Sequence, residues 1–213
     1  MTYAVKEMFF TLQGEGANTG RAAVFVRFAG CNLWSGLERD RAGAVCSFCD
    51  TEFVGTNGTG GGKFRAPEDL AGAALETWPA DMAVQPKPLI VATGGELLLQ
   101  LDEALIDAFH QAGFEVAVET NGTLPAPPGL DWICVSPKAD AVLQQRRGNE
   151  LKLVYPQENV DPQTFRALAF DHFFLQPMDG PERAENTEAA IRYIQAHPQW
   201  RLSIQTHKLI GIP

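Results

Sequence analysis

Apolar and polar positions alternate along the chain in short stretches that predict strands, and amphipathic stretches between them predict helices. Seven runs are rich in β-branched and aromatic residues, as strands are; they cover residues 22–28, 89–93, 115–119, 132–136, 151–154, 172–176 and 201–205. Helical spacing with suitable end residues marks residues 67–78, 102–112 and 186–196. Mostly apolar strands that alternate with helices predict an α/β fold around a parallel sheet. The 213 residues fit one domain.

Polar residues directly follow five of these runs. The segments are Cys31 after the first run, Thr93-Gly94-Gly95-Glu96 after the second, Thr120-Asn121-Gly122 after the third, Ser136-Pro137-Lys138 after the fourth and Gln176-Pro177-Met178-Asp179 after the sixth. Parallel strands present their carboxyl ends at one edge of the sheet, where loops from several strands converge on ligands. We therefore expect the five segments to share one site.

An excess of acidic residues narrows the kinds of partner to expect. Asp and Glu number 26 against 17 Lys and Arg, a formal net charge of −9. Because nucleic-acid binding needs clustered positive charge, we expect a small-molecule partner and no nucleic acid. No apolar run approaches the roughly 20 residues that cross a bilayer, so no membrane partner is expected. The first ten residues carry no export signal, which predicts a cytoplasmic protein with reduced thiols that are available to metals.

A glycine-rich segment over residues 55–62, GTNGTGGG, has two interpretations. It could cradle phosphate, but it lacks the Gly-Lys-Ser/Thr ending of a phosphate-binding loop, and no clear strand leads into it. The favoured interpretation is therefore a surface loop.

Three of the four cysteines, Cys31, Cys46 and Cys49, lie close together in the sequence. One interpretation is a zinc site with Cys134 as the fourth ligand. Against it, Cys134 lies in an apolar strand, where cysteine packs as a small hydrophobe. The other interpretation is an iron–sulfur cluster, whose irons are normally held by thiolates. Three thiolates on a four-iron cluster leave one iron open.

Several short motifs carry a resemblance to a known family. They are Phe10-Thr11-Leu12-Gln13-Gly14-Glu15-Gly16, Arg27-Phe28-Ala29-Gly30-Cys31-Asn32-Leu33, Ser47-Phe48-Cys49-Asp50-Thr51, Gly94-Gly95-Glu96, Glu119-Thr120-Asn121-Gly122, Ser136-Pro137-Lys138 and Thr206-His207-Lys208. In these motifs the chain resembles the radical S-adenosylmethionine (SAM) superfamily and, within it, the 7-carboxy-7-deazaguanine synthases of queuosine precursor biosynthesis. The resemblance implies an incomplete, TIM-like α/β barrel of mostly parallel strands. It also implies one core domain, residues 1–213, with an elaborated cluster-binding loop at residues 31–49.

The activity that this resemblance implies is that of a lyase. It would convert 6-carboxy-5,6,7,8-tetrahydropterin to 7-carboxy-7-deazaguanine by hydrogen abstraction, ring contraction and loss of ammonia. Cys31, Cys46 and Cys49 would hold a [4Fe–4S] cluster whose open iron binds SAM. The implied SAM-binding residues are Phe48, Cys49, Asp50, Gly94, Gly95, Glu96, Glu119, Asn121, Ser136, Pro137, Lys138, Gln176, Pro177, Met178 and Asp179. Among them, Glu96 is suited to accept a hydrogen bond from the SAM amino group.

By the same resemblance, a second set of residues would bind the pterin. The set is Leu12, Gln13, Gly14, Glu15, Arg27, Thr93, His207 and Pro213. Gln13 and Glu15 suit the amide and amidine groups of a pterin edge, and Arg27 suits the substrate carboxylate. Thr51 is the implied protein ligand of Mg²⁺, which substrate oxygens and water would complete. Each has a plainer alternative: turn residues, a solvent-facing arginine, a loop threonine and a C-terminal tail.

Two features depart from the common superfamily pattern. Residues 34–45 lengthen the segment between the first two cysteines, and Leu97 stands where proline is frequent. The nearest alternative enzyme is a glycyl-radical activating enzyme, which also couples three cysteines to SAM but acts on a large protein. An alternative outside the enzymes is a non-catalytic zinc-binding module. By resemblance we also expect a homodimer and a reductant protein such as flavodoxin.

Overall fold

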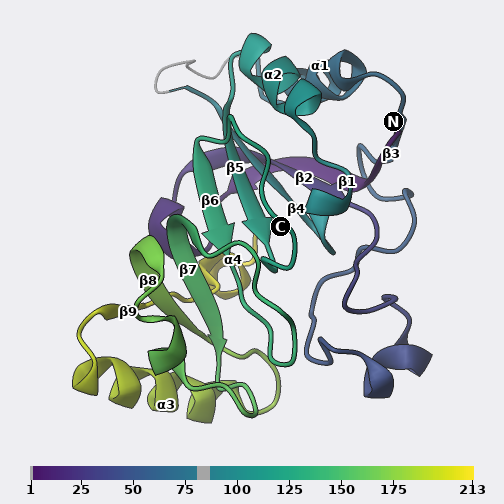
Figure 1. The fold of residues 1–213 in the computed structure, drawn as a ribbon. Coiled ribbons are helices and arrows are strands. Elements are labelled where there is room, and N and C mark those ends of the chain that lie inside the picture. Colours follow the sequence, from purple (N-terminus) through teal and green to yellow (C-terminus); the bar gives the residue numbers. More distant parts are fainter. Residues whose placement is uncertain (1, 81–86) are drawn as a thin grey trace.

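The computed structural model describes residues 2–80 and 87–213, which form a curved, open sheet with helices on its outer side (Figure 1). The strands are β1 (Tyr3–Leu12), β2 (Ala22–Phe28), β3 (Gly62–Phe64), β4 (Leu89–Gly94), β5 (Glu115–Thr120), β6 (Trp132–Val135), β7 (Arg147–Tyr155), β8 (Ala169–Pro177) and β9 (Trp200–Leu202). They lie in the order β3-β1-β2-β4-β5-β6-β7-β8-β9. From β2 onward every neighbouring pair is parallel, whereas β1 runs antiparallel to β2 and to β3. β3 and β9 are the two edges, so the barrel stays open.

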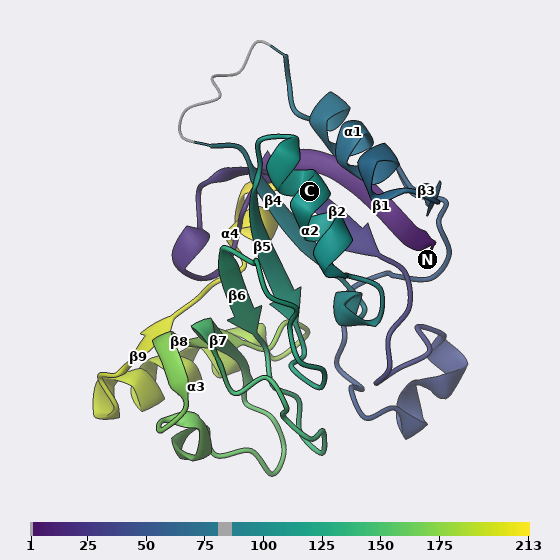
Figure 2. The same ribbon diagram turned by 45° about the horizontal axis from the view of Figure 1, so that its top comes forward.

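The longer helices cover the convex side of the sheet. They are α1 (Pro67–Thr77), α2 (Glu103–Gln111) and α3 (Arg183–Ala196). The short α4 (Thr206–Ile210) instead lies beside the turn after β1, where the amide of Thr206 donates to the carbonyl of Gly14. α1 and α2 lie side by side over the half of the sheet that contains β1, β2 and β5, and α3 covers β8 and β9 (Figures 1 and 2). None of the described helices has the length and apolar character needed to span a bilayer.

Strict alternation along β2 decides which side chains meet these helices. Val24, Val26 and Phe28 are fully buried in the layer between the sheet and the helices, together with Leu105 and Phe109 of α2. Full burial of each such side chain contributes about 1.5–3 kcal/mol. The intervening residues of β2 therefore point to the concave side of the sheet.

The concave side changes character along the strands. At the amino ends it is apolar, where Ala23, Leu89, Val91 and Ala117 form a small buried cluster. Toward the carboxyl ends of the strands the same face becomes polar. It then carries Arg27, Thr93, Glu119, Lys152 and Gln176, which lie near one another in the sheet because the parallel registers align their strands. The fold thus provides an apolar floor and a polar rim at the carboxyl edge.

Most predicted elements are present, and the mostly parallel α/β arrangement is confirmed. Each of the seven predicted runs overlaps a strand, and residues 22–28 coincide with β2. β1 and β3 were not predicted, nor was α4. In β1 the charged pair Lys6 and Glu7 interrupts the apolar pattern, yet both side chains find partners in the fold, Glu52 and Arg27 respectively.

Several predicted boundaries are wrong, and β8, for example, begins at Ala169 rather than at His172. α3 begins at Arg183 rather than at Asn186, whose side-chain amide instead donates to the carbonyl of Met178 at 3.0 Å. β9 ends at Leu202, because Ser203 turns inward and donates to Gln176 at 2.9 Å. β7 begins at Arg147, inside a polar stretch without any strand pattern.

The glycine-rich segment, residues 55–62, packs along β1. The amide of Gly58 donates to the carbonyl of Lys6 at 2.9 Å, and the amide of Met8 donates to Thr59 at 2.7 Å. A Cβ on Gly58 would lie 2.7 Å from that same Lys6 carbonyl oxygen. The glycines are therefore explained by close approach to a strand, which supports the surface-loop interpretation.

Candidate active site

The carboxyl ends of the parallel strands surround a cavity of about 380 Å³. This volume lies within the range of roughly 300–1,000 Å³ that is usual for small-molecule sites. All the predicted site residues line the cavity except Cys31, Glu96 and Pro137. The expectation that segments from several strand ends share one site is therefore met.

The cavity also contains residues to which the sequence analysis gave no role. They are Glu7, Phe9, Phe25, Glu52, Thr120, Lys152, Val154, Gln205 and Lys208. Thr120 and Lys208 belong to motifs named above. For Lys152 a signal did exist, because a lysine inside the apolar run LKLV is unusual for a buried parallel strand. For Gln205 no local signal existed, since the chain brings it back from beyond β9.

The three clustered cysteines are free thiols close to the carboxyl end of β2. The amide of Leu33 donates to Cys31 Sγ at 3.4 Å. Burial raises the pKa of Cys31. A hydrogen bond with Cys46 lowers the pKa of Cys49 to about 6, while the same bond raises that of Cys46. Cys49 is thus disposed to be a thiolate near neutral pH, the form that binds iron.

The inserted residues 34–45 brace the cysteine loop. They contain a 3-10 helix (Glu38–Gly43), and Trp34 packs edge-on against Phe53 at 5.6 Å between ring centroids. The guanidinium of Arg41 lies 4.1 Å from the Trp34 ring centre and donates to the carbonyls of Ser47 at 2.8 Å and Cys49 at 3.1 Å. The insert therefore fixes the backbone that carries Cys46 and Cys49.

The Gly94-Gly95-Glu96 segment supports the end of β2. A Cβ on Gly95 would collide with the Gly30 carbonyl oxygen and lie 2.7 Å from Cys31 Cβ. The Glu96 carboxylate is fully buried and accepts from the amides of Leu98 (3.0 Å) and Asn121 (2.8 Å) and from the Thr120 hydroxyl (2.8 Å). In this structure its partners are thus protein donors, and its predicted bond to SAM stays a prediction.

Leu97 is fully buried in the core cluster beneath the helices, which explains an apolar residue at this position.

Pro137 does not line the cavity, but its carbonyl accepts from Gln157 at 3.2 Å. The side chain of the adjacent Lys138 does line it and donates to Ser136 Oγ at 2.7 Å. Lys138 also lies 5.9 Å from the ring centre of Phe48, so a cation is held near the cysteine loop.

Cys134 has a different environment from the one predicted. It is buried in β6, as expected, but its neighbours across the sheet are Glu119 of β5 and Glu150 of β7 rather than apolar side chains. It therefore belongs to the polar concave face. Among residues 2–80 and 87–213, no three His, Cys, Asp or Glu side chains converge on a point where one metal ion could bind. The donor geometry thus gives no support to a zinc site that includes Cys134.

Arg27 points into the cavity rather than to solvent. Its Nε donates to Glu7 Oε1 at 2.7 Å across the β1–β2 pair, and its side chain is 20% exposed. This bond orients the guanidinium through Nε and does not involve its two terminal nitrogens. A planar fork of this kind suits a carboxylate.

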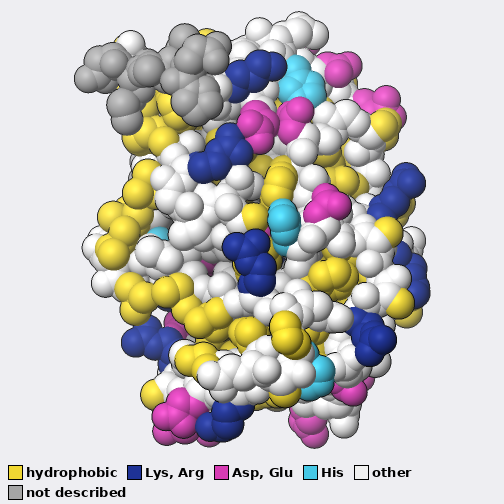
Figure 3. All heavy atoms as spheres, turned by 90° about the vertical axis from the view of Figure 1, so that its left-hand side faces the viewer, with side chains coloured by type: hydrophobic (Ala, Val, Ile, Leu, Met, Phe, Trp, Pro, Cys, Tyr) yellow, Lys and Arg dark blue, Asp and Glu magenta, His cyan; other side chains and the backbone are white. Residues whose placement is uncertain are grey.

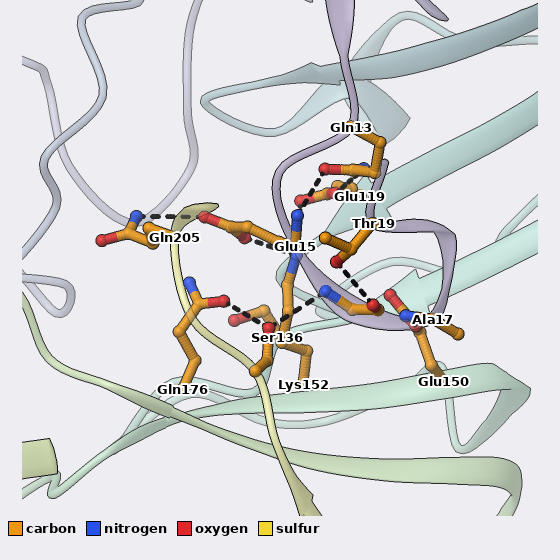
Figure 4. A network of polar contacts seen from close by, with 12 residues as sticks. Gln13, Glu15, Ala17, Thr19, Glu119, Ser136, Glu150, Lys152, Gln176 and Gln205 are labelled. Carbon is orange, nitrogen blue, oxygen red and sulfur yellow. Dashed lines mark hydrogen bonds and ion pairs between the residues drawn. The ribbon is translucent and has the colours of Figure 1, made fainter. Parts of the chain in front are cut away.

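A buried ion network joins the turn after β1 to the centre of the sheet (Figure 4). Lys152 Nζ lies 2.6 Å from Glu15 Oε2 and 2.9 Å from Glu119 Oε2. Gln13 donates to the other oxygen of Glu119 at 2.8 Å, and Gln205 donates to the other oxygen of Glu15 at 3.0 Å. Glu15 and Gln13 are therefore parts of a fixed polar wall rather than loose turn residues.

The C-terminal segment closes one side of the cavity. The amide of Thr206 donates to Gly14 at 3.0 Å, and the Thr11 hydroxyl donates to the Pro213 carbonyl at 3.0 Å. Lys208 Nζ bridges Asp50 of the cysteine loop (2.6 Å) and Asp179 after β8 (2.7 Å). The C-terminal segment is thus a strap that connects three loops of the site, rather than the loose tail of the plainer alternative.

We expect Lys208→Ala to loosen this strap without unfolding the protein. An exposed ion pair contributes about 0.2–1 kcal/mol, so loss of two should speed amide hydrogen exchange in α4 by roughly 2- to 30-fold. Hydrogen-exchange mass spectrometry on the whole chain measures this. The matched control is Arg192→Ala, which removes an exposed pair with Glu188 in α3. Equal exchange in α4 for wild type and Lys208→Ala would mean that the bridge does not hold the strap.

On the face shown in Figure 3, the described Lys and Arg side chains are dispersed among acidic and apolar ones. A surface that follows a phosphate backbone gathers its positive charge instead. The charge that matters for small ligands is therefore the local charge inside the cavity.

Fold and site together define the class: a partial TIM-like α/β barrel with a three-cysteine loop and a polar cavity at its carboxyl edge, as in radical SAM enzymes. No protein-family model matches the chain. Curated proteins named 7-carboxy-7-deazaguanine synthase match it from end to end. Those of Bordetella pertussis, Caulobacter vibrioides and Nitratidesulfovibrio vulgaris are 64%, 62% and 53% identical over 216 residues, covering 100% of this chain and 100% of each relative. The chain belongs to the 7-carboxy-7-deazaguanine synthase family.

A solved structure agrees with this assignment. The crystal structure of QueE from Escherichia coli superposes with a TM-score of 0.71 and 29% sequence identity, over 97% of this chain and 95% of that chain. The partial-barrel prediction is thereby confirmed. Family membership also sets aside both alternatives, the glycyl-radical activating enzyme and the zinc-binding module.

Proposed function

We propose that this chain converts 6-carboxy-5,6,7,8-tetrahydropterin to 7-carboxy-7-deazaguanine, with loss of ammonia, in queuosine precursor biosynthesis. The observation that carries the proposal is that Gln13, Glu15 and Arg27 line the same cavity as Cys46 and Cys49, in a member of the synthase family. The cavity therefore places hydrogen-bonding groups that suit a polar heterocycle beside cysteines that can bind iron.

Cys31, Cys46 and Cys49 would hold a [4Fe–4S] cluster, which supplies the electron that releases a radical from SAM. The donor set fits such a cluster, because its thiolates bind different irons and need not converge on one point. The low pKa of Cys49 and the N–H bond to Cys31 Sγ both favour thiolates. The backbone after Cys46 and the loops at Gly94, Ser136 and Gln176 would hold SAM against the cluster.

The substrate side follows from hydrogen-bonding capacity. The terminal nitrogens of Arg27 would bind the substrate carboxylate, since Glu7 engages only its Nε. Glu15 and Gln13 would read the pterin edge. Glu119, which the family resemblance groups with SAM, shares Lys152 with Glu15, so we assign it to the pterin side. Thr51 would contribute one oxygen to a Mg²⁺ ion that substrate and water complete.

Further parts of the proposal concern organisation. We take residues 1–213 as one radical SAM core domain with the elaborated loop at residues 31–49. We also retain a homodimer, a reductant protein such as flavodoxin, and the cytoplasm as the site of action. Size-exclusion chromatography with light scattering would test the homodimer directly.

The proposed function is tested with protein reconstituted with iron and sulfide in the absence of oxygen. On reduction we expect a [4Fe–4S]⁺ electron paramagnetic resonance signal that changes when SAM is added. With carboxytetrahydropterin and Mg²⁺ we expect 7-carboxy-7-deazaguanine and ammonia. SAM cleavage without conversion of the pterin would reject the substrate. A protein that carries zinc and shows no response to SAM would reject the cluster.

A further inference from the structure

A single buried cation lies between the two carboxylates that face the substrate side of the cavity. The side chain of Lys152 is 3% exposed, and those of Glu15 and Glu119 are 13% and 21% exposed. An ammonium so deeply buried is costly unless each of its bonds is satisfied, and a buried partner left alone is costlier still. The burial of each group therefore depends on the other two, although they come from three separate segments: β7, the turn after β1, and β5.

We propose that Lys152 is a positioning residue for substrate selection, which sets Glu15 and Glu119 side by side as acceptors for the N–H donors of a 2-amino-4-oxopyrimidine edge. This inference deepens the proposed function and rests on it. According to it, the preference for a pterin over related heterocycles depends on Lys152, which need not contact the substrate itself.

The bonds around the pair leave acceptor capacity that points to such a ligand. Each carboxylate gives one oxygen to Lys152 and the other to a glutamine, Gln205 for Glu15 and Gln13 for Glu119. A carboxylate oxygen has two acceptor positions, so each oxygen keeps one. Because donors contact both oxygens of each carboxylate, rotation of the carboxylates is restricted (the surrounding residues are drawn in Figure 4). The wall thus presents a fixed row of acceptors that a ligand with adjacent N–H groups can occupy.

The charge balance explains why a lysine is needed. Two carboxylates that share a buried site cannot both stay ionised without a cation, and one would take up a proton. Burial alone would raise the pKa of Glu15, but the adjacent Lys152 outweighs it and the pKa is lowered. Burial would also lower the pKa of Lys152, but its acidic neighbours, Cys134 first and then Glu119, Glu15 and Glu150, raise it well above its ordinary value. Burial raises the pKa of Cys134 itself well above its ordinary value.

The test compares ligand binding by the reconstituted protein with SAM and Mg²⁺ present. The probes are 6-carboxypterin and 6-carboxylumazine, which carries an oxygen where the pterin has its amino group. We expect wild type to prefer the pterin by tenfold or more, since a site built to accept from the 2-amino group rejects an analogue that presents an acceptor oxygen at that position. In Lys152→Met we expect pterin affinity to fall about 10- to 100-fold, as loss of bonds to charged groups implies. Lumazine affinity should fall less, and SAM affinity should not change.

A pH profile separates positioning from mere stability. Wild-type pterin affinity should be flat between about pH 6 and about pH 8, whereas that of Lys152→Met should rise with pH as the shared proton leaves. The matched control is Lys6→Met, which removes another buried, ion-paired lysine outside the cavity. Lys6→Met should lower the stability of the protein but keep the wild-type ratio of pterin to lumazine affinity and the wild-type pH profile.

A second variant keeps the inference testable if Lys152→Met folds poorly. Lys152→Met combined with Glu119→Gln restores the net charge of the cluster, so its pH profile should be flat. Its preference for the pterin over the lumazine should still be smaller than that of Glu119→Gln alone, because Lys152 no longer holds Glu15. An unchanged ratio and a flat profile in folded Lys152→Met, or a ratio in the double variant equal to that of Glu119→Gln, would overturn the inference. If wild type binds the pterin selectively but forms no product, the proposed function fails. The role of Lys152 is then still decided by comparing the ratio of pterin to lumazine affinity in wild type and variant.

Discussion

Gly95→Ala is expected to destabilise the protein by about 3 kcal/mol and to reduce its turnover at least 100-fold. The added Cβ would collide with the carbonyl oxygen of Gly30 and approach Cys31 Cβ to 2.7 Å. Backbone atoms cannot rotate away as a side chain can, so the end of β4 must separate from Gly30. The amide of Glu96 would then lose its 2.9 Å bond to that carbonyl. Cys31 would move with it, away from the position that its cluster requires.

Two measurements check this result: chemical unfolding of the apoprotein, and iron content after reconstitution. Gly72→Ala is the control, because nothing lies within 4 Å of a Cβ at that exposed position in α1. A helical Gly→Ala exchange should stabilise the protein by about 0.5–1 kcal/mol and leave iron content unchanged. Full iron content in folded Gly95→Ala would show that the close approach does not position Cys31.

The strands could be predicted where local pattern and tertiary role agree. β2 alternates between a helix-covered face and the concave face, so its bounds follow from its sequence alone. β7 fails this test, because Glu150 and Lys152 are charged and yet buried. Glu15 and Glu119 pair with Lys152, and the amide of Ala17 donates to Glu150 at 2.8 Å. These partners arrive from other segments, which no local window contains.

The site was predictable for a different reason. Its residues follow strand ends in the sequence, and a parallel sheet brings such ends to one edge. That rule and the family motifs located the cavity, but they could not distinguish residues that face it from residues that support it. Glu96 belongs to the second kind, since its three donors come from two different loops. The strap residue Lys208 was recognised only as part of a motif, because its partners, Asp50 and Asp179, are distant in sequence.

Glu96→Ala is expected to remove about 3–5 kcal/mol of stability, a large part of what a domain of this size possesses. The exchange would leave the amides of Leu98 and Asn121 and the hydroxyl of Thr120 without their acceptor. Each unsatisfied buried donor costs about 1–3 kcal/mol, and a water that enters the vacated space recovers part of the sum. Denaturant unfolding of wild type and variant measures the difference. A loss below about 1 kcal/mol would mean that these bonds do not hold the Gly94-Gly95-Glu96 segment.

Glu96→Gln keeps the shape of the side chain but removes its ability to ionise, so its effect on stability should depend on pH. Burial raises the pKa of Glu96, and bonds from Asn121, Leu98 and Thr120 only partly offset it. For an acid with a raised folded-state pKa, the stabilisation is complete below the unfolded pKa and declines as pH rises through the folded one. Glutamine does not titrate, so the stability that Glu96→Gln loses relative to wild type should be larger at about pH 4 than at about pH 7. A deficit that instead grows with pH would mean that the donors around Glu96 outweigh its burial, and that the ionised carboxylate is the form this segment is built to hold.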